Sequence, residues 1–245
     1  MTDIARVLDR YTMTLEPHEP GTDEWFQDWV LRSPKQAGHH LTAGWHAYAS
    51  LLDIYSPADI FSATEFFGGL GVQALVIQDL FKPVDHVVLE YAREGVDHMR
   101  RVLPGHVDVR QRDSYRPESF VAADLYGVDF GDLTCWKTRE GEQHRVLLDR
   151  IFATDPKAVV FTDIACRYLH LHRERYESLL GPGTCASYPQ YLQALLARLQ
   201  ALYGYRLHRG YWDRWSTVMA LVPDYVEGRP LLFETPDQPV GLELF

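Results

Sequence analysis

Three acidic residues and a turn of three glycines, all in the first half of the chain, carry the chemistry that the sequence suggests. Glu65 precedes the turn, Glu90 follows it, and Asp113 comes further on with Ser114 directly behind it. Glycines let a backbone approach a ligand closely, and a helix that starts behind them offers free N–H groups. Carboxylates accept hydrogen bonds from hydroxyls and amines. The pattern indicates a nucleotide-like ligand at the turn, whose glycines are Gly68, Gly69 and Gly71.

The elements that must position these residues alternate between strand and helix. A strand over 59–67 leads into the glycine turn, and the apolar periodicity of 72–81 behind the turn predicts a helix. The three acids then fall at the ends of three successive strands, which is where open α/β sheets bind ligands. Further strands are expected over 85–90, 106–113, 126–132 and 157–163, and helices through 96–102, from Ser114 and Pro117, and over 139–153.

The last part of the chain departs from this alternation. Residues 189–203 have a strong helical pattern, with Pro189 near its start and Gly204 directly behind its end. The strands expected over 205–211 and 216–222 are so close in sequence that they form a hairpin and run antiparallel. The expected fold is therefore α/β: a seven-stranded, mostly parallel sheet with helices on both faces and an antiparallel C-terminal hairpin.

Residues 1–58 show helical patterns and precede the first expected strand. We expect them to form an N-terminal helical cap, with the ligand-binding domain over 59–245. The segment 25–48 is rich in Trp, Tyr and His, and we expect it to form part of a pocket beside the ligand.

Composition narrows the class of protein. The chain has 245 residues, 46% of them hydrophobic, and a formal net charge of −10, which argues against a large phosphate-binding surface. Its three cysteines form no CxxC pair, which favours a reducing compartment. No signal-peptide core and no membrane-spanning run is evident, so we expect a cytoplasmic protein without a membrane partner.

The alternating sheet, the final hairpin and the glycine turn with its acids resemble the class I S-adenosylmethionine (SAM)-dependent methyltransferase family, over roughly residues 59–225. The resemblance implies SAM as the cofactor. It implies that Glu90 binds the ribose hydroxyls, that Asp113 binds the adenine amine with Ser114 beside it, and that Glu65 lies near the methionine ammonium. The family's turn usually reads Asp/Glu-x-Gly-x-Gly-x-Gly. Here Phe67 stands in the place of the first glycine, which leaves open which glycine touches the cofactor.

The loop behind the fourth expected strand is where this family carries its catalytic residues. In the stretch 131–136 we expect Asp132 to position or deprotonate the acceptor and Trp136 to stack on a flat one. The acceptor is then a nucleic-acid base, a nucleotide or a small planar molecule. The chain has no Pro-Pro pair, Cys135 lacks a preceding proline, and Asp163 is followed by Ile164 rather than Asn. These departures from known subtypes leave the acceptor open, and we expect no metal.

Two other functions stay open at this point. The missing subtype motif is compatible with a non-catalytic, methyltransferase-like binding protein. Gly69, Gly71 and Ala74 also satisfy the looser dinucleotide pattern G-x-G-x-x-G/A, so an NAD-binding Rossmann protein is the second alternative. No Tyr-x-x-x-Lys pair is present, which removes the apparatus of short-chain dehydrogenases. The sequence indicates neither the oligomeric state nor the pathway.

Overall fold

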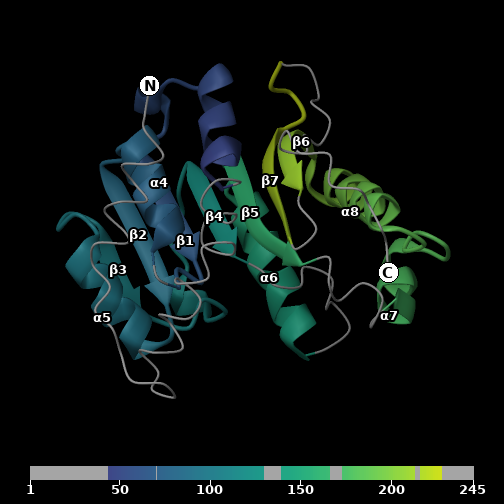
Figure 1. The fold of residues 1–245 in the computed structure, drawn as a ribbon, viewed down its shortest axis with the longest axis horizontal. Coiled ribbons are helices and arrows are strands. Elements are labelled where there is room, and N and C mark those ends of the chain that lie inside the picture. Colours follow the sequence, from purple (N-terminus) through teal and green to yellow (C-terminus); the bar gives the residue numbers. More distant parts are fainter. Residues whose placement is uncertain (1–43, 70, 130–138, 166–172, 213–215, 228–245) are drawn as a thin grey trace.

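A seven-stranded mixed sheet forms the centre of the protein (Figure 1). The structure is a computed structural model, and it describes residues 44–69, 71–129, 139–165, 173–212 and 216–227. The order of the strands is β3-β2-β1-β4-β5-β7-β6. Their bounds are Ser62–Phe66 (β1), Asp85–Glu90 (β2), Asp108–Gln111 (β3), Leu125–Asp129 (β4), Ala158–Ala165 (β5), Tyr205–Trp212 (β6) and Ser216–Pro223 (β7).

The pairing of the strands confirms the expected fold class. Strands β1 to β5 pair in parallel with one another, in the order β3-β2-β1-β4-β5. Strand β7 inserts between β5 and β6 and runs antiparallel to both. Strand β1 pairs with β2 on one side and with β4 on the other, so the strand order reverses there. Ligands of open α/β sheets bind at such a switch point, outside the carboxyl ends of the strands.

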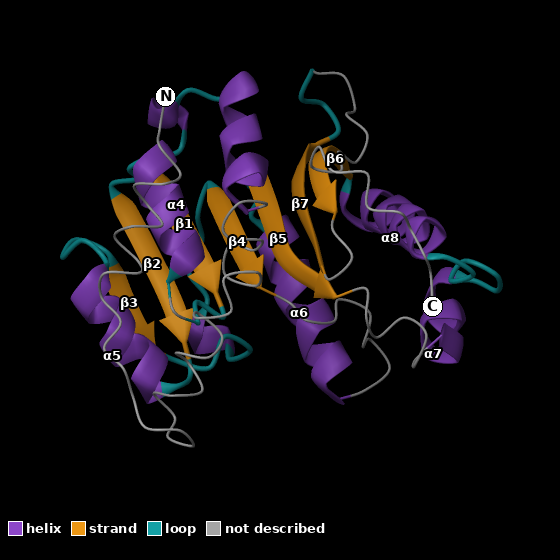
Figure 2. Cartoon of the chain, viewed as in Figure 1, coloured by secondary structure: helices purple, strands orange, loops and turns teal. Residues whose placement is uncertain are grey.

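Helices cover both faces of this sheet (Figure 2). Their bounds are Val72–Leu80 (α4), Arg93–Val102 (α5), Arg139–Ala153 (α6), Arg173–Leu180 (α7) and Tyr188–Tyr203 (α8). Helices α4 and α5 and the helical residues 44–50 share one apolar cluster on one face, and helices α6, α7 and α8 share a second cluster. None of the helices among the described residues is both long and apolar enough to cross a membrane.

Most of the expected elements are present among the described residues. The helix expected over 139–153 and the strand expected over 85–90 have the predicted bounds. Helix α8 begins behind Ser187, whose hydroxyl accepts from the backbone N–H of Gln190, and ends at Gly204 in the left-handed region (φ 70°). Strand β4 is described over Leu125–Asp129, paired with β5 up to its last residue, and the end predicted at 132 lies outside the described residues.

Two further expectations about secondary structure are corrected. The helix expected from Ser114 and Pro117 is only the short 3-10 turn Pro117–Ser119, because Phe120 behind it returns to an extended backbone conformation. Strand β3 ends at Gln111, two residues before Asp113. Helix α7 had no counterpart in the sequence reading, because its residues show little apolar periodicity.

The segment in front of β1 packs against the sheet. Ala47, Tyr48 and Leu51 have no exposed surface and belong to the same cluster as the buried face of α4. In the same segment, the carbonyl of Ser50 is hydrogen-bonded to His208 on β6 over 2.9 Å. The domain boundary predicted at residue 58 stays a prediction, since residues 1–43 lie outside the described part of the chain.

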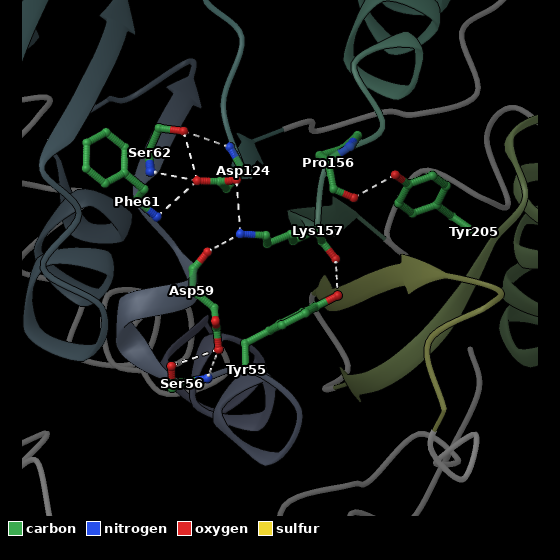
Figure 3. A network of polar contacts seen from close by, with 9 residues as sticks. All are labelled: Tyr55, Ser56, Asp59, Phe61, Ser62, Asp124, Pro156, Lys157 and Tyr205. Atoms are coloured by element: carbon green, nitrogen blue, oxygen red, sulfur yellow. Dashed lines mark hydrogen bonds and ion pairs between the residues drawn. The ribbon is translucent and has the colours of Figure 1, made fainter.

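A polar network at the amino edge of the sheet fixes this segment (Figure 3). The Asp124 carboxylate accepts the backbone N–H groups of Phe61 (2.9 Å) and Ser62 (3.0 Å) and pairs with Lys157 Nζ at 3.3 Å. Lys157 also donates to the carbonyl of Asp59, and its own carbonyl accepts from the Tyr55 hydroxyl over 2.9 Å. One carboxylate thus joins the starts of β1, β4 and β5.

We predict that Asp124→Ala lowers the free energy of unfolding by about 1–3 kcal/mol, because two backbone N–H groups lose their acceptor and Lys157 loses its ion-pair partner. Urea unfolding followed by circular dichroism measures this. The matched control is Asp108→Ala, which breaks only an exposed pair with Arg110 and should cost under about 1 kcal/mol. Equal losses in the two variants would contradict the role given to Asp124.

Candidate functional site

The glycine turn between β1 and α4 is held in a conformation that few residue types adopt. Phe67, Gly69 and Gly71 all have positive φ angles, of 61°, 53° and 79°. The N–H of Gly68 donates to the carbonyl of Leu89 on β2 (2.9 Å), and the N–H of Gly71 donates back to Gly68 (2.8 Å). A phenylalanine in the left-handed region stores strain, which commonly occurs at functional sites.

The three glycines are needed for different reasons. A Cβ on Gly68 would lie 2.3 Å from Val88 Cγ1, and one on Gly71 would lie 2.9 Å from Met99 Cγ. Packing against β2 and α5 therefore requires these two. Gly69 is exposed, and the nearest atom to a Cβ there would be the carbonyl oxygen of Phe67 at 3.9 Å. Gly69 is thus the glycine of the turn that a ligand can approach.

Glu90, the acid at the end of β2, holds this turn. Its Oε2 accepts the backbone N–H of Gly69 and its Oε1 accepts that of Ala92, both over 2.7 Å. Each carboxylate oxygen can accept a second hydrogen bond, so the group remains able to bind ligand hydroxyls. Gly95 on α5 lets the helix approach, since a Cβ there would meet the Gly69 carbonyl at 2.6 Å. The structure therefore brings Glu90 and Gly69 together.

Asp113 and Ser114 lie on the loop behind β3. The buried Ser114 hydroxyl accepts the N–H of Phe67 over 3.4 Å, which ties this loop to the glycine turn. Asp113 accepts the N–H of Tyr115 over 3.0 Å and pairs with Arg116 at 3.5 Å. Asp113 lines a pocket of about 440 Å³ together with Tyr91, Gln111, Arg112, Arg116, Glu118 and Ser119.

Tyr91 is a site candidate that the sequence reasoning missed. It follows Glu90 directly, lines the same pocket as Asp113, and leaves 76% of its surface exposed. An exposed tyrosine ring offers a flat apolar face to a planar ligand group. The sequence feature that could have identified Tyr91 is its position directly after Glu90, the acid at the end of β2.

Glu65 is buried beneath the turn, with 2% of its surface exposed. It receives the backbone N–H of Ala74 in the first turn of α4, but its Oε2 has no hydrogen-bond partner among the described residues. Burial, and the negative charges of Asp129 and Glu90, raise the pKa of Glu65 well above its ordinary value.

Three half-buried rings lie together beside the turn. The Phe67 ring contacts the rings of Tyr115 and His144, and the Tyr115 hydroxyl lies 2.9 Å from His144 Nε2.

The predicted catalytic residues Asp132 and Trp136 lie outside the described residues, so their roles stay predictions. The acid that ends β4 is Asp129, which is exposed and accepts from the Thr162 hydroxyl over 3.2 Å. The sequence analysis did not single out Asp129, because it lies inside the strand predicted over 126–132. Among the described residues, no group of three His, Cys, Asp or Glu side chains has the geometry of a metal site.

Comparisons with known proteins identify the fold. No protein-family model matches the sequence, and no curated protein matches it. Among solved structures, the plantazolicin methyltransferase BpumL with S-adenosylhomocysteine (SAH) has a TM-score of 0.53 at 10% identity, over 90% of this chain and 95% of that one. BamL, a plantazolicin methyltransferase solved with a triazolic desmethylPZN analogue and SAH, scores 0.52 at 9% identity, over 90% and 96%.

A candidate RNA methyltransferase from Pyrococcus horikoshii also scores 0.52, at 14% identity, over 89% of this chain and 98% of that chain. The chain therefore has the class I SAM-dependent methyltransferase fold.

We predict that Glu65→Gln stabilises the protein increasingly as the pH rises. The folded-state pKa of Glu65 is raised, so its favourable contribution is complete below the ordinary value of 4.5 and is lost as the pH rises through the folded-state pKa. The free energy of unfolding of the variant, minus that of the wild type, should therefore grow between about pH 5 and pH 8, by at most about 1.4 kcal/mol per pH unit. Urea unfolding at stepped pH measures it. Glu174→Gln, at an exposed position on α7, is the control and should follow the wild type. A constant difference between Glu65→Gln and wild type would contradict the buried, protonated state of Glu65.

Proposed function

We propose that this chain is a SAM-dependent methyltransferase that binds its cofactor across the carboxyl ends of β1, β2 and β3. The observation that carries the proposal is the exposed Gly69 held by Glu90 over 2.7 Å, beside the point where the strand order reverses. The fold supports it, and the solved neighbours BpumL and BamL hold SAH, the product that SAM leaves after methyl transfer.

The described residues suggest a place for each part of the cofactor. Glu90 has acceptor capacity left for the ribose hydroxyls. The pocket of about 440 Å³ offers the adenine ring the exposed face of Tyr91 and the Asp113 carboxylate for its amine. Because Gly69 has no side chain, its backbone can approach the cofactor closely. The methionine part of the cofactor then extends towards Glu65. Ser114 is buried and bonded to the turn, so in this proposal it supports the site without touching the cofactor.

Transfer of a methyl group from a sulfonium is an in-line displacement. Much of its rate comes from holding the nucleophile and the methyl group together in line. The acceptor that we propose is planar: a nucleic-acid base, a nucleotide or a small aromatic molecule. The half-buried rings of Phe67, Tyr115 and His144 at this edge support a planar acceptor. We further propose that Trp136 stacks on it and that Asp132 positions or deprotonates it.

We expect Gly69→Ala to weaken SAH binding at least about tenfold, which corresponds to about 1.4 kcal/mol, because its Cβ would stand on the side where the cofactor lies. We expect Glu90→Ala to weaken it by about 1–3 kcal/mol through the lost acceptors. Isothermal titration calorimetry with SAH measures both.

The matched controls are Gly183→Ala, at a glycine that also has a positive φ (76°) and whose Cβ would meet nothing within 4 Å, and Asp97→Ala, which breaks only an exposed pair with Arg93. Both controls should bind SAH like the wild type. A wild-type protein that binds NAD tightly and SAH not at all would overturn the proposed function. A protein that binds SAH but transfers no methyl group to any planar acceptor would be a binding protein with this fold.

For the catalytic step, we expect Asp132→Asn to keep SAH affinity and lower turnover about 100-fold or more, because a general base contributes rate that binding does not report. Transfer of a labelled methyl group from SAM to RNA, nucleotides and small aromatic acceptors measures turnover. A variant with normal turnover and about 1 kcal/mol less stability would instead indicate that Asp132 caps the segment behind it.

A further inference from the structure

A second and larger cavity, of about 780 Å³, lies between helix α4 and the C-terminal end of helix α5. These two helices cover the same face of the sheet (Figure 1). The connection from α4 to β2 and the residues directly behind α5 complete its wall. The described residues that line it are all different from those that line the pocket of Tyr91 and Asp113. Its volume is within the range of about 300–1,000 Å³ that small-molecule sites have.

The walls of this cavity are mainly apolar. Leu75 of α4 and Leu103 behind α5 form part of its lining and are 8% and 7% exposed. Pro83 and Val102 add further apolar surface. Val84, directly in front of β2, lines the same cavity and leaves 64% of its surface exposed. Because exposed apolar side chains beside a hollow favour an apolar ligand, the body of the ligand that fits here is apolar.

A chain of three hydrogen-bonded side chains forms the polar part of the wall. Gln78 of α4 is 8% exposed, and its Nε2 donates to Nδ1 of His86 on β2 over 2.7 Å. Its Oε1 accepts from Nε2 of His106 over 2.9 Å. His86 is 1% exposed and anchors this chain in the core. Gln78 and His106, which both line the cavity, are therefore held in place before a ligand binds, and this lowers the ordering cost of binding.

Two side chains of opposite charge line the same cavity. Lys82, behind the end of α4, is exposed and has no ion-pair partner among the described residues. Its ammonium offers three N–H donors to an anion. Asp79, three residues earlier on α4, is half-buried and repels a second negative charge. This pair of charges favours a ligand with one negative charge over a phosphate or a polyanion.

We propose that this cavity binds a small monocarboxylate with an apolar body. The carboxylate pairs with Lys82 Nζ, and the apolar body packs against Leu75, Leu103 and Val84. The inference is independent of the proposed function, because the site lies apart from the edge that we assign to SAM. A polyanionic partner such as a nucleic acid is disfavoured by Asp79 and by the formal net charge of −10.

Ligand-observed NMR titration of the full chain tests the site with two monocarboxylates, the flat indoleacetate and the linear octanoate. We expect saturable one-to-one binding of at least one of them. Skatole and octanol, which have the same apolar bodies without the carboxylate, should bind at least about fivefold more weakly than their acids, because they lack the ion pair. Raising the ionic strength should weaken binding of the acid and leave binding of its neutral analogue unchanged.

Two variants at exposed positions test the role of the cation. Lys82→Gln removes the positive charge, and Val84→Glu places a negative charge beside it. Each should unfold like the wild type and bind the monocarboxylate at least about fivefold more weakly, and Lys82→Gln should bind the neutral analogue within about twofold of the wild type. Arg198→Gln, which removes an exposed cation on α8, is the matched control and should bind both like the wild type.

Competition with SAH and with inorganic phosphate completes the test. Neither should displace the monocarboxylate. Absence of saturable binding by both acids, equal affinities of Lys82→Gln and the wild type, or displacement by either competitor would each overturn the inference. The proposed function is tested separately, by SAH binding to the Gly69→Ala and Glu90→Ala variants, so failure at this cavity and failure at the cofactor edge are distinguishable.

Discussion

The Glu90 carboxylate restrains the loops at the edge of the sheet where the parallel strands end. Glu90 accepts the N–H of Gly69 from the turn behind β1 and the N–H of Ala92 from its own loop, each over 2.7 Å. The turn needs such a restraint because Phe67 and two of its glycines have positive φ angles. Ser114 adds a hydrogen bond from the loop behind β3. The ends of three strands are thereby joined before any ligand arrives, which lowers the ordering cost of binding.

Close packing at glycines and a second polar network position this edge of the sheet. Gly68 and Gly71 bring Val88 and Met99 against the turn, and Gly95 brings α5 against Gly69, so the glycines on both sides set the distance between β1 and α5. At the opposite edge, Asp124 ties the starts of β1, β4 and β5 together. Between the two edges lies a largely apolar core, in which Glu65 is one of several buried polar side chains with an unsatisfied atom among the described residues.

The sequence predicts the features that depend on interactions between nearby residues and misses those that depend on residues far apart in the chain. Local patterns were sufficient for the helix over 139–153, the strand over 85–90 and the glycine behind α8, because periodicity and caps act within a few residues. The sequence showed that the turn needs glycines, but which one stays open to a ligand depends on Val88 and Met99, which no local pattern reports. Asp129 lies inside the strand predicted over 126–132, and its hydrogen bond with Thr162 depends on the pairing of β4 with β5, which no local pattern reports. Tyr48 belongs to the segment 25–48 that the sequence singles out, but its position over Gly127, far along the chain, follows from no local pattern.

A crystal structure of the protein grown with SAH tests most directly whether this edge of the sheet binds SAM. We expect continuous electron density across the carboxyl ends of β1, β2 and β3, with the ribose hydroxyls on Glu90, the adenine beside Tyr91 and Asp113, and the backbone of Gly69 in contact with the ligand. Crystals that contain SAH elsewhere, for example in the cavity lined by Gln78, Lys82 and His106 at the other end of α4, would contradict it.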